Sequence, residues 1–274
     1  MIETRAEQAE LLASFRETPG GAPHRLRVGL AMSTADVHAA QRLRYRVFAG
    51  ELGAKLSGRE PGRDEDIFDA WCEHLVVRDC GSGSIVGTYR LLTAERAARL
   101  GTFYADQEFD LTRLTHLKPR MVEIGRACVD PAYRSGAALM LLWHGIFDFM
   151  RRRRYDYLAG CASICMRDGG ANAERVHQRV AQRHLAPIEY RVFPRHRLLP
   201  REARRGNDEA APPRVPALLK GYLRLGAWIG GEPSWDPDFN TADLFVLLPL
   251  ARLEARYAQH FGGGRPSQRD RRAE

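Results

Sequence analysis

Two charged residues interrupt a segment that otherwise has the pattern of a buried strand. Val122, Ile124 and Cys128 recur at even spacing, which predicts a β-strand. Glu123 and Arg126 lie within this strand, and burying a charge costs free energy unless the charge is paired or used in chemistry. Desolvation raises the pKa of a carboxylate, which suits a general base acting directly or through one water. We therefore predict that Glu123 and Arg126 are catalytic, with a carboxylate neutralised by Arg126 for structural reasons as the alternative.

The strand is followed by a short basic turn and then by a helix. Asp130-Pro131 ends the strand, and residues 137–149 carry apolar side chains at helical spacing. The backbone N–H groups at such a helix N-terminus can bind a phosphate. The predicted phosphate-binding residues are Arg134, Ser135, Gly136 and Ala137.

Composition limits the class of protein. The chain has 274 residues, a formal net charge of +8 and five cysteines. The positive charge favours an anionic partner, but no zinc-finger, helix-turn-helix or aromatic RNA-binding pattern is present, so we do not expect nucleic acid binding. The cysteines lack metal-ligand spacing, so reduced thiols and no metal site are expected. We find no signal peptide and no run of about 18 apolar residues, so we expect a soluble or peripherally attached protein.

The remaining pattern predicts a single α/β (α+β) domain with a mixed central sheet flanked by helices and a C-terminal extension. The predicted domain spans residues 25–261, between a flexible lead (1–24) with a helix candidate at 7–16 and a disordered basic tail (262–274). Strands are expected at 25–32, 74–79, 84–92, 155–164, 188–193 and 243–248. Further helices are expected at 172–183 and 250–261, and a mobile loop at about 201–216. Residues 218–229 are amphipathic or apolar, and either rest at a membrane interface or pack in the core.

The order of strand, phosphate turn and helix, with a carboxylate on the strand, resembles the acyl-binding core of the GNAT acyltransferase superfamily. The resemblance implies a GNAT-like fold and acyl transfer. In the common pattern the turn has more glycines, whereas here Arg134 is followed by Gly136 and then by Ala137-Ala138. This difference favours a donor with one phosphate, such as the 4′-phosphopantetheine arm of acyl carrier protein, over coenzyme A. We expect no permanently bound cofactor.

The N-terminal half is similar to the acyl-homoserine lactone synthases. The matching blocks are Leu43-Arg44-Tyr45-Arg46-Val47-Phe48, Asp66-Ile67-Phe68-Asp69, Thr88-Tyr89-Arg90-Leu91-Leu92 and Val122-Glu123-Ile124-Gly125-Arg126. In that family the matching residues form a charged network at the acyl cleft. The resemblance implies this role for Arg44, Phe48, Asp66, Asp69, Arg90, Glu123 and Arg126. A tryptophan of that family is replaced by Ala54, which argues against lactone chemistry.

Other blocks resemble the L-ornithine Nα-acyltransferases, a family also labelled hemolysin-like. They lie at 133–136, 141–143, 155–158, 160–163, 219–226 and 238–243, and the whole resemblance runs from about residue 25 to 261. It implies transfer of a 3-hydroxyacyl chain from acyl carrier protein to the α-amine of L-ornithine. The product would be lyso-ornithine lipid, in the first step of ornithine lipid synthesis.

Binding of ornithine would require charged side chains of both signs. The δ-ammonium needs an anion and the α-carboxylate needs a cation. The candidates are Asp66, Asp69 and Asp243 for the ammonium, and Arg44 and Arg90 for the carboxylate. The alternative is a salt-bridge network that only holds the loop after the first helix. Asn240 either lines the same cleft or caps a turn.

The tetrahedral intermediate needs fixed hydrogen-bond donors for its oxyanion. The backbone N–H of Cys128 or Val129 is the expected source. Cys128 acting as an acyl-accepting nucleophile is the alternative, but no histidine lies near it in the sequence.

Partners and competing functions follow from charge and resemblance. The basic runs at 151–154 and 195–205 are either solvated faces or docking surfaces for acidic acyl carrier protein or anionic lipid. The protein is expected in the cytoplasm, either free or in peripheral contact with the inner face of the membrane. The competing functions are an acyl-homoserine lactone synthase, an acyl-CoA-dependent N-acetyltransferase, and a membrane-active hemolysin-type protein without catalysis.

Overall fold

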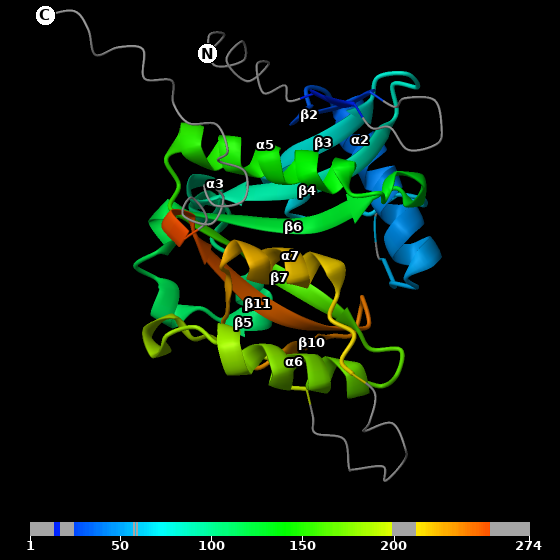
Figure 1. Cartoon of the computed structure of the whole chain (residues 1–274). Coiled ribbons are helices and arrows are strands. Elements are labelled where there is room, and N and C mark those ends of the chain that lie inside the picture. Colours follow the sequence, from blue (N-terminus) through cyan, green and yellow to red (C-terminus); the bar gives the residue numbers. More distant parts are fainter. Residues whose placement is uncertain (1–13, 17–24, 57, 59, 199–211, 253–274) are drawn as a thin grey trace, which may run out of the picture.

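One mixed β-sheet runs through the molecule (Figure 1). The computed structural model describes residues 14–16, 25–56, 58, 60–198 and 212–252. Nine strands form the sheet, in the order β1-β2-β3-β4-β6-β7-β11-β10, with β9 paired to β11. Among the paired strands of the described residues, only the central β6–β7 pair is parallel. The strands are β1 (Ser14–Arg16), β2 (Arg25–Leu30), β3 (Glu73–Asp79), β4 (Ile85–Thr93), β6 (Met121–Val129), β7 (Tyr157–Cys165), β9 (Trp228–Ile229), β10 (Ser234–Asp236) and β11 (Thr241–Pro249).

Helices cover both faces of this sheet because its strands are apolar on both sides. On β3, Leu75 and Val77 pack in one core with α5 (Ala137–Arg153), whereas Val76 packs in another with α2 (Thr34–Tyr45). The helices α6 (Ala171–His184) and α7 (Ala217–Leu225) lie on the same side as α5 and cover β7 and β11 (Figure 1).

Shorter elements occupy the other face, beside a third cluster of buried side chains. They are α3 (Ala94–Leu100), α4 (Ala105–Glu108), the six-residue π-helix η2 (Arg46–Glu51), 3₁₀ turns including η3 (Asp69–Trp71), and a two-stranded sheet of β5 (Phe109–Asp110) with β8 (Phe193–Pro194). The predicted fold class, a mixed sheet flanked by helices, is confirmed.

Most predicted elements are present, and the exceptions have local reasons. The strand predicted at 188–193 is wrong: Ile188–Tyr190 is a 3₁₀ turn, and Ile188 is exposed instead of buried in a sheet. Pro187 precedes this turn and cannot donate to a β-ladder. Within the helix candidate at 7–16, residues 14–16 are a strand paired with β2, and the rest lies outside the described residues.

The predicted C-terminal elements are found in part. The segment 218–229 is helical only as far as Leu225, after which Trp228–Ile229 pairs with β11. A helix begins at Leu250, but residues 253–274 lie outside the described residues, and so do 1–13, 17–24 and 199–211. The predicted lead, tail and most of the mobile loop therefore stay predictions.

The two central strands separate part of the way along their length. The β6–β7 ladder ends at the pair Ile124 and Gly160, although both strands continue for five more residues to Val129 and Cys165. A Cβ atom on Gly160 would lie 2.3 Å from the carbonyl oxygen of Ile124, so only glycine allows this close approach.

Next to this point β6 contains a β-bulge. Two of its residues, Arg126 and Ala127, lie opposite the single residue Tyr89 of β4, and Arg126 has φ +53°. The bulge turns β6 away from β7, so that a gap opens between the strands.

This close approach gives a test of the sheet. We expect Gly160→Ala to lower the free energy of unfolding by about 1–3 kcal/mol, because the added methyl group would collide with the Ile124 backbone. Gly125→Ala is the matched control, since its Cβ would meet no atom within 4 Å. Urea unfolding followed by circular dichroism measures both. Equal midpoints for the two variants would contradict this account of the sheet.

Candidate active site

A cavity of about 250 Å³ lies where β6 and β7 separate. Glu123 to Ala127 of β6 line one wall and Cys161 and Ser163 of β7 line another. Six of the lining residues are aromatic: Phe48, Phe68, Tyr89, Tyr104, Tyr222 and Phe239. The space combines a mostly apolar wall with a few charged groups, which is typical of a site for a small or extended ligand.

A buried network of arginines and aspartates lies beside the cavity. The Arg44 side chain is 0% exposed, and its Nε donates to Asp64 over 2.8 Å. Its two Nη atoms each donate to Asp69 over 2.9 Å. Burial alone would raise the pKa of Asp69, but the Arg44 guanidinium outweighs this effect and holds the pKa well below its ordinary value. Arg44 therefore ties α2 to the loop before β3.

Two further arginines extend this network to the cavity wall. Arg90 donates to Asp66 over 2.6 Å, and Arg126 donates to the other oxygen of Asp66 over 3.1 Å. Arg126 also lies 3.3 Å from Asp64. Arg90 and Arg126 line the cavity, whereas Arg44 and Asp69 do not.

Most residues of this network were predicted from the sequence, but two were not. Arg44, Asp66, Asp69, Arg90 and Arg126 were predicted to share a cleft, and they lie in one cluster. Asp64 and His74 were missed. Asp64 belongs to the same acidic run as Asp66, which was the available signal. His74 is buried and its Nε2 lies 3.0 Å from the Asp69 carbonyl oxygen, a contact that sequence spacing does not reveal.

Removing Arg44 tests what the network contributes. Arg44→Met would leave two buried carboxylates without their main cation, so we expect a loss of about 3–5 kcal/mol in the free energy of unfolding. Arg134→Met is the control, because that guanidinium also binds a carboxylate but its side chain is 41% exposed. Its loss should stay within about 1 kcal/mol. Thermal unfolding distinguishes the two, and comparable losses would contradict a structural role for the buried network.

Glu123 is buried at the start of α4, on the cavity wall. One carboxylate oxygen accepts from the backbone N–H of Tyr104 over 2.6 Å and the other from that of Ala105 over 2.7 Å. Burial raises the pKa of Glu123 to about 7, although these two N–H groups act in the opposite direction. Each oxygen keeps a second lone pair, so the carboxylate can still accept a proton.

Glu123 and Arg126 are not an ion pair. Arg126 forms its contacts with Asp64 and Asp66 instead, so the alternative in which Arg126 neutralises Glu123 is wrong. The bulge explains this, because it turns the Arg126 side chain toward the loop. There its guanidinium carbon lies 4.5 Å from the ring centre of Phe239 and 5.2 Å from that of Tyr104.

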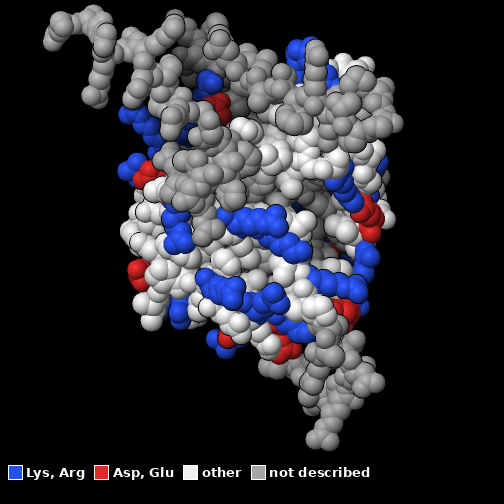
Figure 2. Space-filling view, viewed as in Figure 1, with Lys and Arg blue, Asp and Glu red and all other residues white. Residues whose placement is uncertain are grey.

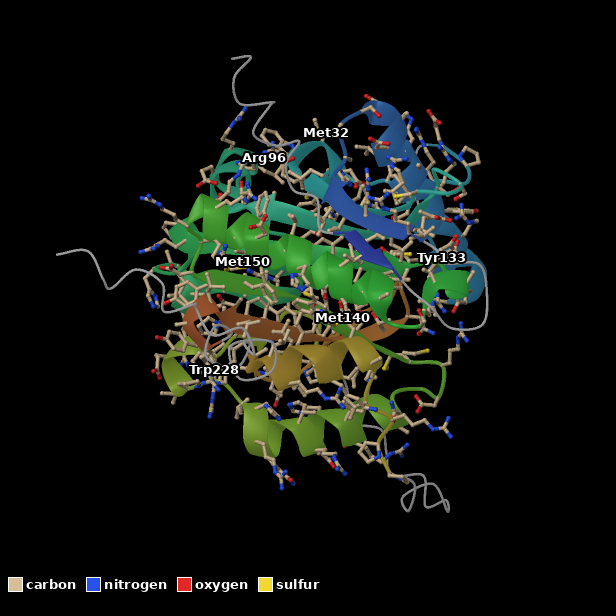
Figure 3. All side chains as sticks on the ribbon, turned by 45° about the horizontal axis from the view of Figure 1, so that its top comes forward. Met32, Arg96, Tyr133, Met140, Met150 and Trp228 are labelled. Carbon is tan, nitrogen blue, oxygen red and sulfur yellow. The ribbon has the colours of Figure 1, made fainter. Side chains whose placement is uncertain are left out.

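The predicted phosphate turn lies at the N-terminus of α5, close to Tyr133 (Figure 3). Arg134 donates through both Nη atoms to Glu51, over 2.6 and 2.8 Å, and through Nε to the carbonyl of Val129. Gly136 has φ +117°, and Ala137 begins the helix. These residues therefore form a helix entrance, with the Arg134 charge held by Glu51, and they lie beyond the end of the cavity lining.

The two predicted oxyanion donors, the backbone N–H groups of Cys128 and Val129, point in opposite directions. The backbone N–H of Asp130 donates to Val86 of β4, and N–H direction alternates along a strand. The N–H of Cys128 therefore points toward β4, and that of Val129 points away from β4. The Cys128 thiol is buried against α2, and burial raises its pKa to about 12, so it is a neutral core thiol.

Asp243 lies at the β10–β11 end of the cavity, whereas Asn240 lies outside it. Asp243 is buried on β11 and lines the cavity, and its carboxylate accepts from the Thr241 hydroxyl over 2.9 Å. Burial raises its pKa to about 6. Asn240 is an exposed turn residue with φ +52°, outside the cavity lining. Asp236, which the sequence analysis missed, lines the cavity beside Asp243.

Among the residues that the structure describes, no group of three or more His, Cys, Asp or Glu side chains is placed to hold a metal ion.

Comparison with known proteins gives close relatives in sequence. The acetyltransferase (GNAT) domain family matches residues 43–144. An L-ornithine N(alpha)-acyltransferase of Brucella abortus (strain 2308) is 40% identical over 254 residues, covering 86% of this chain and 89% of that protein. A protein of the same name from Rhodobacter capsulatus is 35% identical over 251 residues, covering 88% of this chain and 96% of that protein.

Solved structures with a similar fold are distant in sequence. FeeM, an N-acyl amino acid synthase from uncultured soil microbes, has a TM-score of 0.53 at 11% identity, covering 85% of this chain and 95% of that chain. The acyl-homoserine lactone synthase LasI has a TM-score of 0.52 at 12% identity, covering 94% and 100%. At these sequence identities, the comparison supports a similar fold and nothing further.

Proposed function

The chain belongs to the L-ornithine Nα-acyltransferase family and is an acyltransferase of the GNAT type; within that family we propose that it transfers a 3-hydroxyacyl chain from acyl carrier protein to the α-amine of L-ornithine. The product would be lyso-ornithine lipid. The observation that carries the proposal is a buried carboxylate, Glu123, on the wall of a mostly apolar cavity between two separated strands.

Acyl transfer to an amine needs a neutral amine, an electrophilic thioester and hydrogen-bond donors that stabilise the oxyanion of the tetrahedral intermediate. An ammonium cannot attack, so a base must remove a proton first. Glu123, whose pKa is raised to about 7, suits this role directly or through one water. The amine nitrogen then bonds to the thioester carbon, the C–S bond breaks, and the thiolate leaving group takes up a proton. The Val129 backbone N–H, which points away from β4, is the proposed oxyanion donor.

The proposed acyl donor is the 4′-phosphopantetheine thioester of acyl carrier protein. The helix α5 begins at Ala137 without a side-chain cap, and the backbone N–H groups of a first helical turn suit one phosphate group. Arg134 supplies a positive charge there, and its guanidinium is paired with Glu51. The arm would then run along the gap between β6 and β7 toward Glu123.

Contact with an anionic membrane is proposed for the face formed by α6 and α7. Figure 2 shows bands of Lys and Arg side chains across this view of the molecule. Exposed members are Arg179 and Arg183 on α6, and Lys220 and Arg224 on α7. The inner side of α7 contributes Leu218 and Tyr222 to the cavity, so a lipid product would leave close to this face. No described helix is both long and apolar enough to cross a bilayer.

The reaction itself is the direct test. Purified protein is incubated with L-ornithine and either 3-hydroxyacyl carrier protein or the corresponding 3-hydroxyacyl-CoA, and product mass is measured. We expect N-acylornithine, formed at least about tenfold faster from the carrier protein because the carrier supplies docking contacts that coenzyme A lacks. Equal rates from both donors would contradict the proposed donor, and no product from ornithine would contradict the acceptor.

The role of Glu123 has its own test. We expect Glu123→Gln to lower kcat/KM by about 10²–10⁴, because the amide cannot take the proton. A carboxylate with a pKa of about 7 is protonated, and so inactive as a base, below that pH. The ratio of wild-type to variant kcat/KM should therefore fall as pH drops below 7. A ratio that is constant between pH 5.5 and 8.5 would instead assign Glu123 to holding the start of α4.

A further inference from the structure

Three carboxylates gather at the β10–β11 end of the cavity without a basic partner. Asp236 and Asp243 line the cavity, and Glu108, outside this lining, lies at the C-terminal end of α4 against β10. No Lys or Arg in the described part of the chain is within salt-bridge distance of any of the three.

Strand register places Asp236 and Asp243 on one face of the sheet. Ser234 lies opposite Asp243, and Asp236 lies opposite Thr241. Opposite and alternate residues share a face, so Asp236 and Asp243 are diagonal neighbours. On the other side of β11, Asp243 lies opposite Ser163, which also lines the cavity. The carboxylates are thus held by hydroxyl groups and turns instead of by cations.

Glu108 supplies an independent observation beside this end of the cavity. Its side chain is buried, with the residue only 8% exposed, yet its Oε2 has no hydrogen-bond partner. A buried carboxylate oxygen without a partner costs free energy. Burial, together with the charge of Asp243, raises the pKa of Glu108 to about 7.

The arginines beside the cavity form their ion pairs with other carboxylates. Arg44, Arg90 and Arg126 are matched by the three aspartates of the loop, Asp64, Asp66 and Asp69. Glu123 is held by two backbone N–H groups. The β10–β11 end therefore stays negative, which suits a cationic group of the substrate.

We propose that Asp236, Asp243 and Glu108 form a subsite for the side-chain ammonium of the acceptor amino acid, so that the enzyme selects a diamino acid. The proposal rests on the proposed function and deepens it. A terminal ammonium has three N–H donors and no acceptor, which matches a pocket of three carboxylates. With the side-chain ammonium bound by these carboxylates, the α-amine at the other end of the amino acid would lie closer to Glu123 than the ammonium does. Asp66 and Asp69, the other candidates from the sequence, are already bound by arginines.

The test compares L-ornithine with L-norvaline, which has the same carbon chain but lacks the side-chain amine. Variants are Asp243→Asn, Asp236→Asn and Glu108→Gln, each nearly isosteric. Asn at 236 retains an oxygen to accept from the N–H groups of Asp238 and Phe239, so the turn should be preserved. Asp238→Asn is the matched control, because it removes a carboxylate from the same turn at an exposed position outside the cavity lining.

We expect Asp243→Asn, Asp236→Asn and Glu108→Gln each to lower kcat/KM for ornithine by about 10- to 100-fold, while the value for norvaline changes less than about threefold. The control should leave both substrates unchanged. Equal losses for ornithine and norvaline, or no loss for ornithine, would overturn the subsite.

Calorimetry of ornithine and norvaline binding to the wild-type protein separates this proposal from the proposed function. If ornithine binds, and binds about tenfold or more tightly than norvaline, the subsite stands even when no acyl product forms. If acylornithine forms but both amino acids bind equally, the subsite is wrong and the proposed function stands.

Discussion

The Arg44 guanidinium, buried between Asp64 and Asp69, is the interaction on which the site depends. It fixes the loop after α2 against the sheet, and that loop carries Asp66, which in turn orients Arg90 and Arg126 on the cavity wall. A fully buried charge is tolerated only when its partners are complete, and here every arginine of the cluster has an acidic partner. The charged wall is therefore preorganised before any substrate arrives.

The second constraint is the separation of β6 and β7. Gly160 brings the two backbones into close contact at one point, and the Arg126 bulge turns β6 away beyond it. A sheet that stayed paired would fill the space with ladder hydrogen bonds. Because it does not, the strand that carries Glu123 keeps one edge free for a ligand that can pair with backbone groups.

Sequence patterns predicted the parts of the site that depend on local spacing. Glu123 could be predicted because a charge within an apolar strand costs free energy unless it is used. The arginines and aspartates of the network could be predicted from the family resemblance and from the acidic run in the sequence. Asp236 and Glu108 could not be predicted, because their proximity to Asp243 depends on strand register and on the placement of a four-residue helix. The pairing of Arg134 with Glu51 crosses 83 residues of sequence and left no local signal. At 188–193, the β-branched and aromatic residues have the composition of a strand, but Pro187 precedes a 3₁₀ turn at this position instead.

The shortest helix of the site, α4, is where two of these features meet. Its first amide group and the one before it are bound by Glu123, and its last residue is Glu108. At 1.5 Å per residue this four-residue helix is about 6 Å long, so the proposed base and the proposed ammonium subsite are held only one helical turn apart. A substitution that changes the course of Ala105–Glu108 would therefore alter the surroundings of both carboxylates at once.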